Sequence, residues 1–498
     1  MSNPDADLAA LARGGRTNLV GFALRLAGRI PFLFIAGRIY GPEALGRLAY
    51  AVLVVEFAAQ IATLGLKRGL ALQLTDEGRD PGDSVWDAMT LVLIVGGVFT
   101  ALLIAFPQAM FPNSDINGFD RLLPLVIFAF AGTDIMLAAL AYRFNVRATV
   151  TARALVEPWT ISIAALVLSW YSLRDGLLLA YVASVLAAFV AALVPFVRSY
   201  QWPHLWRPRA DRLMPLLRRN LPLAAADAIE WGSRRIDLAI LGLFVSPATV
   251  GVYYVAQQLA SLPQKLKTSF DPVLGPVITR NLDSGDRPAI ASAISQVGFW
   301  ILAAQAGVAL ALGIPGAAIM GLVGKAGAFV GGNGALAFLL LAEVLAATAV
   351  VSESALVYIA RHRNLMISLG ALALQAGLSF LFIIAMRDRG WPELWQAAGP
   401  AAALAISLGV SAVIKSRLAA RLLGAPVSLW RWPLLFASVA AAAVGGIATA
   451  TPEWSELLIG VPVMLALYAW LIWRFGFKPE DRKLFAKRGI NAESGASP

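Results

Sequence analysis

The feature that most limits what this chain can fold into is a series of apolar runs, each about 20 residues long, along its whole length. The runs are rich in Ala, Leu and Val and do not alternate between apolar and polar residues. Within a bilayer only helices and closed β-barrels satisfy all backbone hydrogen bonds, and barrel strands require that alternation. The sequence therefore predicts an all-α membrane protein that crosses the bilayer many times.

Windows of about 20 residues predict about 14 membrane-spanning helices. Several boundaries coincide with residue pairs that interrupt helices, such as Gly41-Pro42 and Ser246-Pro247. The predicted ranges are 17–38, 44–65, 84–106, 121–141, 150–171, 175–197, 219–245, 248–270, 289–313, 332–359, 364–386, 393–416, 432–450 and 455–474.

Composition supports this class of protein. Apolar residues make up 59% of the chain and charged residues 14%, against about 45–50% and about 25% in soluble domains. The chain has no cysteine, which excludes disulfides and thiol chemistry. Its two histidines, His204 and His362, lie among arginines in predicted loops, which indicates surface positions. We therefore predict neither catalytic residues nor a metal site.

The net charge of +11 is explained by orientation in the membrane rather than by binding of nucleic acid. Lys and Arg gather in alternate predicted loops, and an imbalance of roughly four to one assigns both termini to the cytoplasm. The basic cytoplasmic segments also suit contact with anionic membrane lipids. No predicted outer loop can hold an enzyme domain, and Gly324-Lys325 lacks the other residues of a Walker A motif, which favours transport without ATP.

The predicted helix at 219–245 carries charged residues inside its apolar frame. At about 100° per residue, Asp227, Glu230, Arg234 and Asp237 share one side, and Arg235 is adjacent in the sequence. A charge at the bilayer centre costs about 2.5–3.5 kcal/mol, so this side is expected to face protein or water. Two interpretations fit: a Glu230–Arg234 ion pair that joins helices, or a site for substrate or protons.

The first predicted helix has a polar face formed by Asn18, Arg25 and Arg29. Two arginines four residues apart repel each other unless an anion or a carboxylate lies between them. The alternatives are an anionic substrate or an acid from another helix, such as Glu56 or Asp134. Both interpretations place this face inside the protein.

Further candidates for substrate binding and coupling lie elsewhere in the chain. Lys265, near the cytoplasmic end of the eighth predicted helix, is positioned to attract phosphate or to reach the membrane surface. Burial favours the protonated form of acids in or near predicted spans, although each also fits a structural hydrogen bond. No cofactor is implied, and H⁺ and Na⁺ are the alternative coupling ions for these acids, which are Glu56, Asp134, Asp227 and Glu230.

An internal repeat divides the chain. Residues 16–19 (RTNL) correspond to 218–221 (RRNL), and the turn from Pro42 to Gly46 corresponds to that from Pro247 to Gly251. Six helices in each copy give both copies the same orientation, which predicts two parallel lobes that rock around a central substrate path. The expected domains are an N-terminal lobe at 1–200, a cytoplasmic linker at 201–217, a C-terminal lobe at 218–417, and two additional helices with a basic tail at 418–498.

Three segments resemble those of polysaccharide-biosynthesis flippases in the multidrug/oligosaccharidyl-lipid/polysaccharide exporter superfamily. They read GRIYGPEALGRLAYA, LGLKRGLALQL and RIDLAILGLFVSPATVGVYYVAQQL. The resemblance implies a protein of the bacterial inner membrane that flips undecaprenyl-pyrophosphate-linked oligosaccharide to the periplasmic leaflet. It also implies a glycan polymerase and glycosyltransferases as partners.

The resemblance assigns roles to arginines as well. Relatives bind the anionic head group with cavity arginines on the first helix, which correspond to Arg25 and Arg29 here. Arg234 and Arg235 are the equivalent candidates in the second lobe. The planar guanidinium suits pyrophosphate oxygens and stays charged at physiological pH.

Other functions fit parts of the pattern. A drug/cation antiporter of the same superfamily is expected to have an acidic and aromatic cavity, which the arginines argue against. A membrane-embedded polysaccharide polymerase or ligase would need a large periplasmic loop. A scaffold for glycan synthesis would not need so many charges within its membrane helices.

Overall fold

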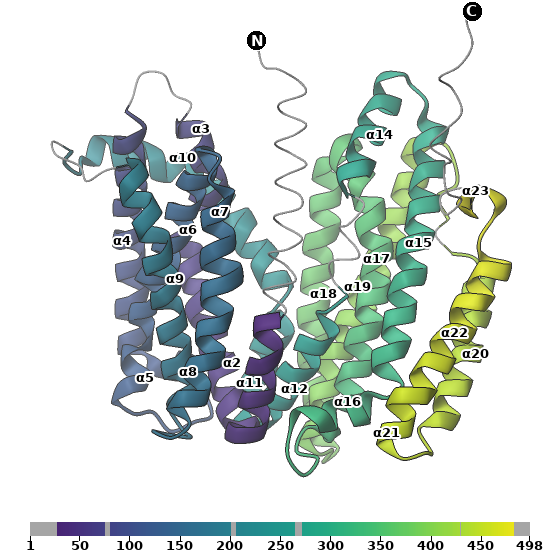
Figure 1. Cartoon of the computed structure of the whole chain (residues 1–498). Coiled ribbons are helices and arrows are strands. Elements are labelled where there is room, and N and C mark those ends of the chain that lie inside the picture. Colours follow the sequence, from purple (N-terminus) through teal and green to yellow (C-terminus); the bar gives the residue numbers. More distant parts are fainter. Residues whose placement is uncertain (1–26, 75–79, 201–205, 264–270, 429, 483–498) are drawn as a thin grey trace, which may run out of the picture. The chain divides into compact units, whose positions relative to one another are not determined.

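The computed structural model describes residues 27–74, 80–200, 206–263, 271–428 and 430–482, and these residues form helices and no β-strands. The prediction of an all-α protein is confirmed. The described residues form two compact units, each with its own packed helices (Figure 1). Unit 1 comprises those within 1–255, 321–329 and 391–397, and unit 2 comprises those within 256–320, 330–390 and 398–498.

Ten helical segments among the described residues are long and apolar enough to cross a membrane. One of them, Ala27–Ala71, has 45 residues, whereas one crossing needs about 20. Gly41, with φ of +84°, turns the chain within this segment, a conformation that glycine adopts without steric cost. The chain is therefore a multi-pass membrane protein, while the number of 14 crossings stays a prediction.

Unit 1 is organised around α2 and α6. Helix α2 packs against α4, α6, α9, α10 and α11, and α6 also contacts α3, α4 and α9. Their buried faces are made of aliphatic and small residues such as Leu45, Ile127 and Ile135. The segments of this unit are η1 (Ala36–Tyr40), α2 (Gly41–Ala62), α3 (Leu66–Leu74), α4 (Pro81–Ala105), η2 (Pro107–Ala109), α5 (Gly118–Leu122), η3 (Leu123–Leu125), α6 (Val126–Tyr142), α7 (Val146–Thr149), η4 (Val150–Val156), α8 (Glu157–Leu168), α9 (Gly176–Tyr200), α10 (Ala210–Ser233), α11 (Ile236–Phe244) and most of α12 (Pro247–Ala260).

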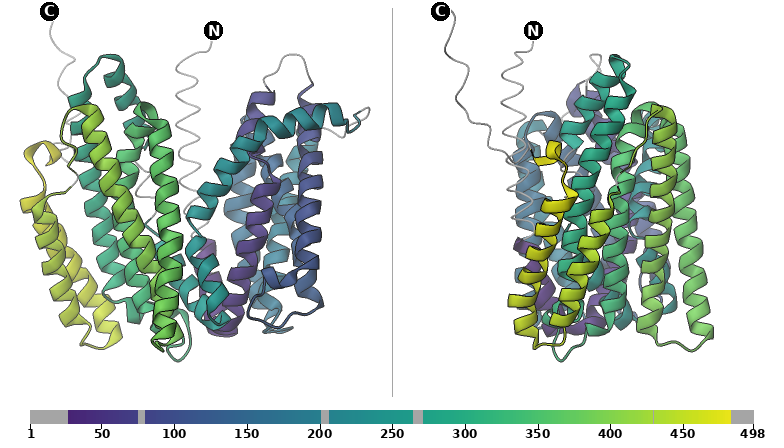
Figure 2. Two further views of the ribbon diagram at one scale, coloured as in Figure 1. Left: turned by 180° about the vertical axis from the view of Figure 1, so that it is seen from behind. Right: turned by 90° about the vertical axis from the view of Figure 1, so that its right-hand side faces the viewer.

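Unit 2 is organised around α15, which packs against α14, α17, α20 and α22. Helices α20 and α22, drawn in yellow, run side by side within this unit (Figures 1 and 2). The remaining segments are α14 (Asp271–Asp283), α15 (Arg287–Gly313), α16 (Gly316–Val323), η5 (Val330–Gly332), α17 (Asn333–Ile359), α18 (Arg361–Asp388), α19 (Glu393–Leu423), α20 (Trp432–Ala448), α21 (Glu453–Ser455), η6 (Glu456–Gly460), α22 (Val461–Leu471), η7 (Ile472–Gly476) and α23 (Pro479–Arg482), of which α16 and α19 have residues in both units.

Hydrogen bonds to Asp481 hold the C-terminal end of unit 2 against α15 and the start of α20. Its carboxylate accepts hydrogen bonds from Gln296 Nε2 and Trp300 Nε1, both at 3.0 Å, and from Arg431 Nη1 at 2.6 Å. Burial opposes the charged form, but the hydrogen bond from Arg431 and the other donors hold the pKa of the Asp481 carboxyl below its ordinary value. The carboxylate is therefore charged at neutral pH and pairs with Arg431 in the folded protein.

The predicted helix at 219–245 is not continuous. It begins earlier, at Ala210, and the chain turns at Arg234 and Arg235 between α10 and α11. Gly232 and Ser233 are weak helix formers, and the two arginines after them have carboxylate partners on different helices. Helices α10 and α11 belong to unit 1, because most of their contacts are with the helices of that unit. The predicted division into lobes at residue 218 rests on the sequence repeat and stays a prediction.

The two Pro-x-x-x-Gly turns of the repeat contact each other directly. A Cβ on Gly46 of α2 would lie 1.7 Å from the carbonyl oxygen of Pro247, and a Cβ on Gly251 of α12 would lie 2.0 Å from that of Pro42. Only glycine leaves room for two helix backbones to approach this closely in a membrane. The motifs that identify the repeat in the sequence are therefore the two halves of one helix crossing.

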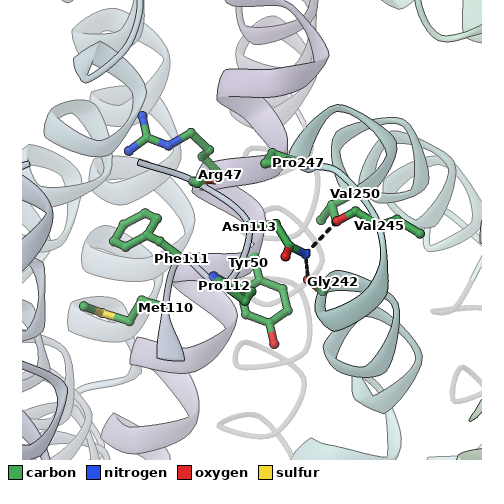
Figure 3. A pocket seen from close by; sticks show the side chains of 12 residues that line it. Arg47, Tyr50, Met110, Phe111, Pro112, Asn113, Gly242, Val245, Pro247 and Val250 are labelled. Carbon is green, nitrogen blue, oxygen red and sulfur yellow. Dashed lines mark hydrogen bonds between the residues drawn. The ribbon is translucent and has the colours of Figure 1, made fainter. Parts of the chain in front are cut away.

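Asn113, from the segment that follows α4, joins this crossing to α11. Its Nδ2 donates hydrogen bonds to the carbonyl oxygens of Gly242 at 3.0 Å and Val245 at 2.9 Å (Figure 3). The cavity beside these residues has a volume of about 10 Å³, room for about one water molecule. This end of unit 1 is thus tightly packed.

We expect Gly46→Ala and Gly251→Ala each to destabilise the protein by about 1–3 kcal/mol, because the added methyl group forces two backbones apart. Thermal unfolding of the purified protein in detergent measures the effect. Gly97→Ala in α4 is the matched control, since a Cβ there meets nothing within 4 Å. Wild-type stability in both crossing variants would contradict the close contact.

Candidate functional site

Ten charged side chains of unit 1 form three neighbouring groups of ion pairs, which together we call the charge cluster. They lie on α2, α3, α6, η4, α8 and α10 and at the turn between α10 and α11. Five are basic and five are acidic: Lys67, Arg68, Arg153, Arg234 and Arg235 pair with Glu56, Asp134, Glu157, Asp227 and Glu230.

Arg153 is the most enclosed base of the charge cluster, with 15% of its side chain exposed. It pairs with Asp134 on α6 and with Glu157 at 2.7 Å, and its guanidinium lies 4.3 Å from the centre of the Phe130 ring. The helix widens to a π-helix at η4, which ends at Val156, two residues before Pro158. Pro158 has no backbone N–H and so cannot donate the i to i−4 hydrogen bond of a regular α-helix. This missing hydrogen bond accounts for the wider π-helical turn around Arg153.

Lys67 and Arg68 are neighbours in the sequence but pair with different helices. They follow a tight turn in which Leu64 and Gly65 have φ of 51° and 68°. Lys67 Nζ donates to Gln60 Oε1 at 2.7 Å and also pairs with Asp134 on α6. The turn therefore presents one base to the interior of the unit and its neighbour to α10.

Arg68 holds α10 through two carboxylates. Its Nε lies 3.3 Å from Asp227 Oδ1, and its Nη2 donates to Glu230 Oε2 at 2.7 Å. Glu230 also receives a longer contact of 3.4 Å from Arg234, whose side chain is 70% exposed. Glu230 is thus shared between two exposed arginines.

Arg235 points to α2 instead. It pairs with Glu56 at 3.2 Å and lies 5.0 Å from the centre of the Trp231 ring, which stacks on Phe57. This arrangement explains the break in the predicted helix, because Arg234 and Arg235 cannot both reach their partners from one regular turn. Asp237 is separated from the others and buried, and it accepts a hydrogen bond from Tyr253 at 2.5 Å.

The five positive and five negative charges of the charge cluster balance, so the cluster has no net charge. Each acid of the charge cluster pairs with a base, which agrees with the interpretation of these charges as ion pairs that join helices. Arg29, on the first helix, is exposed and forms no ion pair with any carboxylate in the part of the chain that the structure describes. It is the candidate head-group arginine whose charge is not neutralised by these carboxylates.

Sequence reasoning identified part of this arrangement. Glu56, Asp134, Asp227, Glu230, Arg234 and Arg235 were predicted, and all six lie in the charge cluster. Lys67 and Arg68 lie in the predicted loop between residues 65 and 84 and were therefore counted only among the cytoplasmic basic residues, although Gly65 before them indicates a turn that can fold back. Arg153 was missed as a partner, although its spacing of four from Glu157 predicts that pair.

Three predicted residues, Asn18, Arg25 and Lys265, lie outside the described residues. Within the described part, no three His, Asp or Glu side chains come together as ligands for a metal ion.

We expect Arg153→Ala to destabilise the protein by about 3 kcal/mol or more, because it leaves two enclosed carboxylates short of a cation. Arg234→Ala should change stability by less than about 1 kcal/mol, because it removes an exposed pair. Thermal or denaturant unfolding of both variants tests the difference. Arg153→Ala combined with Glu157→Ala should cost less than the sum of the single changes, and strict additivity would contradict the coupling.

The sequence of this chain matches a known protein family. A family model described as polysaccharide biosynthesis protein matches residues 35–305. The succinoglycan biosynthesis transport protein ExoT of Rhizobium meliloti (strain 1021) is 25% identical over 246 residues. The match covers 47% of this chain and 47% of ExoT, about half the length of that relative.

Solved structures show the same fold. The lipid II flippase MurJ in an inward closed conformation is similar with a TM-score of 0.67 and 11% identity, over 95% of this chain and 100% of MurJ. A multidrug resistance MATE family transporter of the MOP superfamily, in an inward-facing conformation, gives a TM-score of 0.63 and 14% identity. That match covers 80% of this chain and 94% of the transporter.

Proposed function

This chain belongs to the polysaccharide biosynthesis protein family, and we propose that it flips undecaprenyl-pyrophosphate-linked oligosaccharide across the bacterial inner membrane. The observation that carries the proposal is the family match over residues 35–305, which contains the charge cluster. ExoT is named for transport in succinoglycan biosynthesis, and MurJ is named as a lipid II flippase. The product would supply O-antigen, capsule or exopolysaccharide assembly on the periplasmic side, where a glycan polymerase uses it.

Arg29 supports an anionic head group as the part of the substrate that is recognised. Its guanidinium is exposed and unneutralised by described carboxylates, and it offers several donors to pyrophosphate oxygens. Arg25, one helical turn earlier, is proposed to act with it. An anion between them would relieve the repulsion of two like charges at this spacing.

The charge cluster suits a switch in which an anionic substrate replaces a carboxylate as the partner of an arginine, or a proton neutralises that carboxylate. Arg68 and Arg234 are 59% and 70% exposed and share Glu230, so loss of the negative charge on that carboxyl would free Arg234 from its described carboxylate and leave Arg68 with Asp227 alone. We propose that Glu230, with Glu56, Asp134 and Asp227, couples transport to H⁺ or Na⁺. In this mechanism the two lobes alternate access without ATP, and both termini lie in the cytoplasm.

A drug/cation antiporter is the second candidate, because the MATE transporter shares the fold. Deletion of the gene separates the two functions. Loss of surface glycan with undecaprenyl-linked repeat units retained on the cytoplasmic face supports the flippase, and accumulation on the periplasmic face supports a polymerase or ligase. Altered drug sensitivity with normal glycan supports the antiporter.

We expect Arg29→Gln to slow flipping of labelled lipid-linked oligosaccharide in proteoliposomes by about tenfold or more, since a hydrogen bond to a charged group is worth about 1.5–3 kcal/mol. Arg417→Gln in α19, an exposed arginine, is the matched control and should flip at the wild-type rate. Undiminished flipping by a variant with both Arg25→Gln and Arg29→Gln would refute the head-group assignment.

We expect Glu230→Gln to tighten binding of farnesyl pyrophosphate, a short soluble analogue, by a few-fold, because Arg68 and Arg234 lose a shared carboxylate. Tryptophan fluorescence of the protein follows the binding. Glu43→Gln, at an exposed acid of α2, controls for the change in net charge. Unchanged affinity in Glu230→Gln would exclude Glu230 as the exchanging group.

A further inference from the structure

A groove crosses the surface of unit 1 between α5, η3, the start of α6 and α9. Its volume is about 320 Å³, within the range of about 300–1,000 Å³ that ligand pockets have. Nine of its ten lining residues are apolar, and the tenth is Asp175. Phe119, Leu122, Leu125 and Leu186 are about half exposed, so the groove is open to the surroundings of the helices.

The groove has the depth of one membrane leaflet. It extends from Asp175, directly before α9, to Leu186, which is about 16 Å further along a helix that rises 1.5 Å per residue. Half of a hydrocarbon core of about 30 Å is similar. Trp170 and Tyr171, just before Asp175, are 83% and 69% exposed, as expected of aromatic residues at head-group level. Asp175 therefore lies where a lipid head group meets its chains.

This end of unit 1 is distinct from the charge cluster. Figure 1 shows α5 at the end of the unit opposite to α3, and none of the residues that line the groove belongs to the charge cluster. With both termini in the cytoplasm, as the sequence predicts, the groove faces the periplasmic leaflet.

Asp175 has the chemistry to hold an ammonium group. Its Oδ1 accepts a hydrogen bond from Asn117 Nδ2 at 3.0 Å, and it forms no ion pair with a described basic residue. A carboxylate at the mouth of an apolar groove favours a cation that brings its own hydrogen-bond donors.

Two arginines adjacent in the sequence to groove residues suit a phosphate. Arg121 precedes Leu122 and is exposed. Arg174 precedes Asp175, keeps 44% of its side chain exposed and donates to the Asp115 carbonyl at 2.8 Å. Its long contact of 3.8 Å with Asp120 is to a carboxylate that Arg47 already holds at 3.0 Å. Carboxylate, arginines and apolar groove thus match the ammonium, phosphate and acyl chain of one lipid class. Choline head groups lack the N–H donors, and glycerol head groups lack the positive charge.

We propose that this groove binds a phospholipid with a primary ammonium head group, such as phosphatidylethanolamine. The ammonium contacts Asp175, the phosphate lies near Arg121 and Arg174, and an acyl chain follows Leu179, Val182 and Leu186 along α9. The proposal is independent of which substrate the protein transports.

Native mass spectrometry of the full-length protein with equal amounts of phosphatidylethanolamine, phosphatidylcholine and phosphatidylglycerol of the same acyl chains tests it. We expect phosphatidylethanolamine to bind preferentially. Asp175→Asn should weaken that binding by about tenfold or more, because the amide still accepts from Asn117 but carries no charge. Asp175→Glu should retain the preference, and Leu179→Trp, which fills the groove, should weaken binding of all three lipids.

Asp388→Asn and Leu381→Trp, at an exposed acid and an exposed leucine of α18, are the matched controls and should bind like the wild type. Thermal unfolding of each variant verifies folding. Equal binding of the three lipids, an unchanged preference in Asp175→Asn, or displacement of phosphatidylethanolamine from the groove by a polyprenyl phosphate would overturn the proposal.

Discussion

The contact on which unit 1 depends is the reciprocal crossing of Gly46 and Gly251. In lipid the hydrophobic effect does not drive one helix against another, so close backbone packing must supply the attraction. Each glycine lies against the carbonyl oxygen of the proline that begins the other motif. The crossing joins α12 to α2 and thereby positions α11, whose end is held by Asn113. The turn before α11, with its two arginines, is located relative to α2 by the same crossing.

Ion pairs supply the remaining attraction between these helices. Lys67 and Arg68, side by side after one turn, connect α6 to α10, while Arg235 connects the next turn to α2. Each ion pair offsets part of the free energy that an unpaired charge would cost within the bilayer. The same pairs cancel the positive charge that a pyrophosphate would need. The proposed transport of an anionic lipid would require some of these pairs to open, and the exposed members, Arg68 and Arg234, are the ones that can do so.

The sequence predicts the fold class well because its main signal is physical and repeats many times. Apolar runs of membrane length admit only helices, and the family resemblance agrees with the match found over 35–305. The pairing within the site was less predictable. Glu230 and Arg234 are four residues apart, so that contact is visible in the sequence, but Arg68 and Glu230 are brought together only by folding. The break at Arg234 and Arg235 has the same origin, since partners on two helices override local helix propensity.

Because the charge cluster is a proposed site and also joins helices to one another, loss of transport in its variants would have two physical causes that must be separated. An enclosed residue such as Arg153, held by two carboxylates and the Phe130 ring, contributes mainly to stability, and its removal reduces transport by loosening α6 from α8. An exposed residue such as Arg234 contributes little to stability, so a transport defect there reports on substrate or coupling. Arg29 is exposed and has no described carboxylate partner, so it is expected to contribute less to stability than any arginine of the charge cluster. A transport defect in an Arg29 variant is therefore the one that a loss of stability explains least.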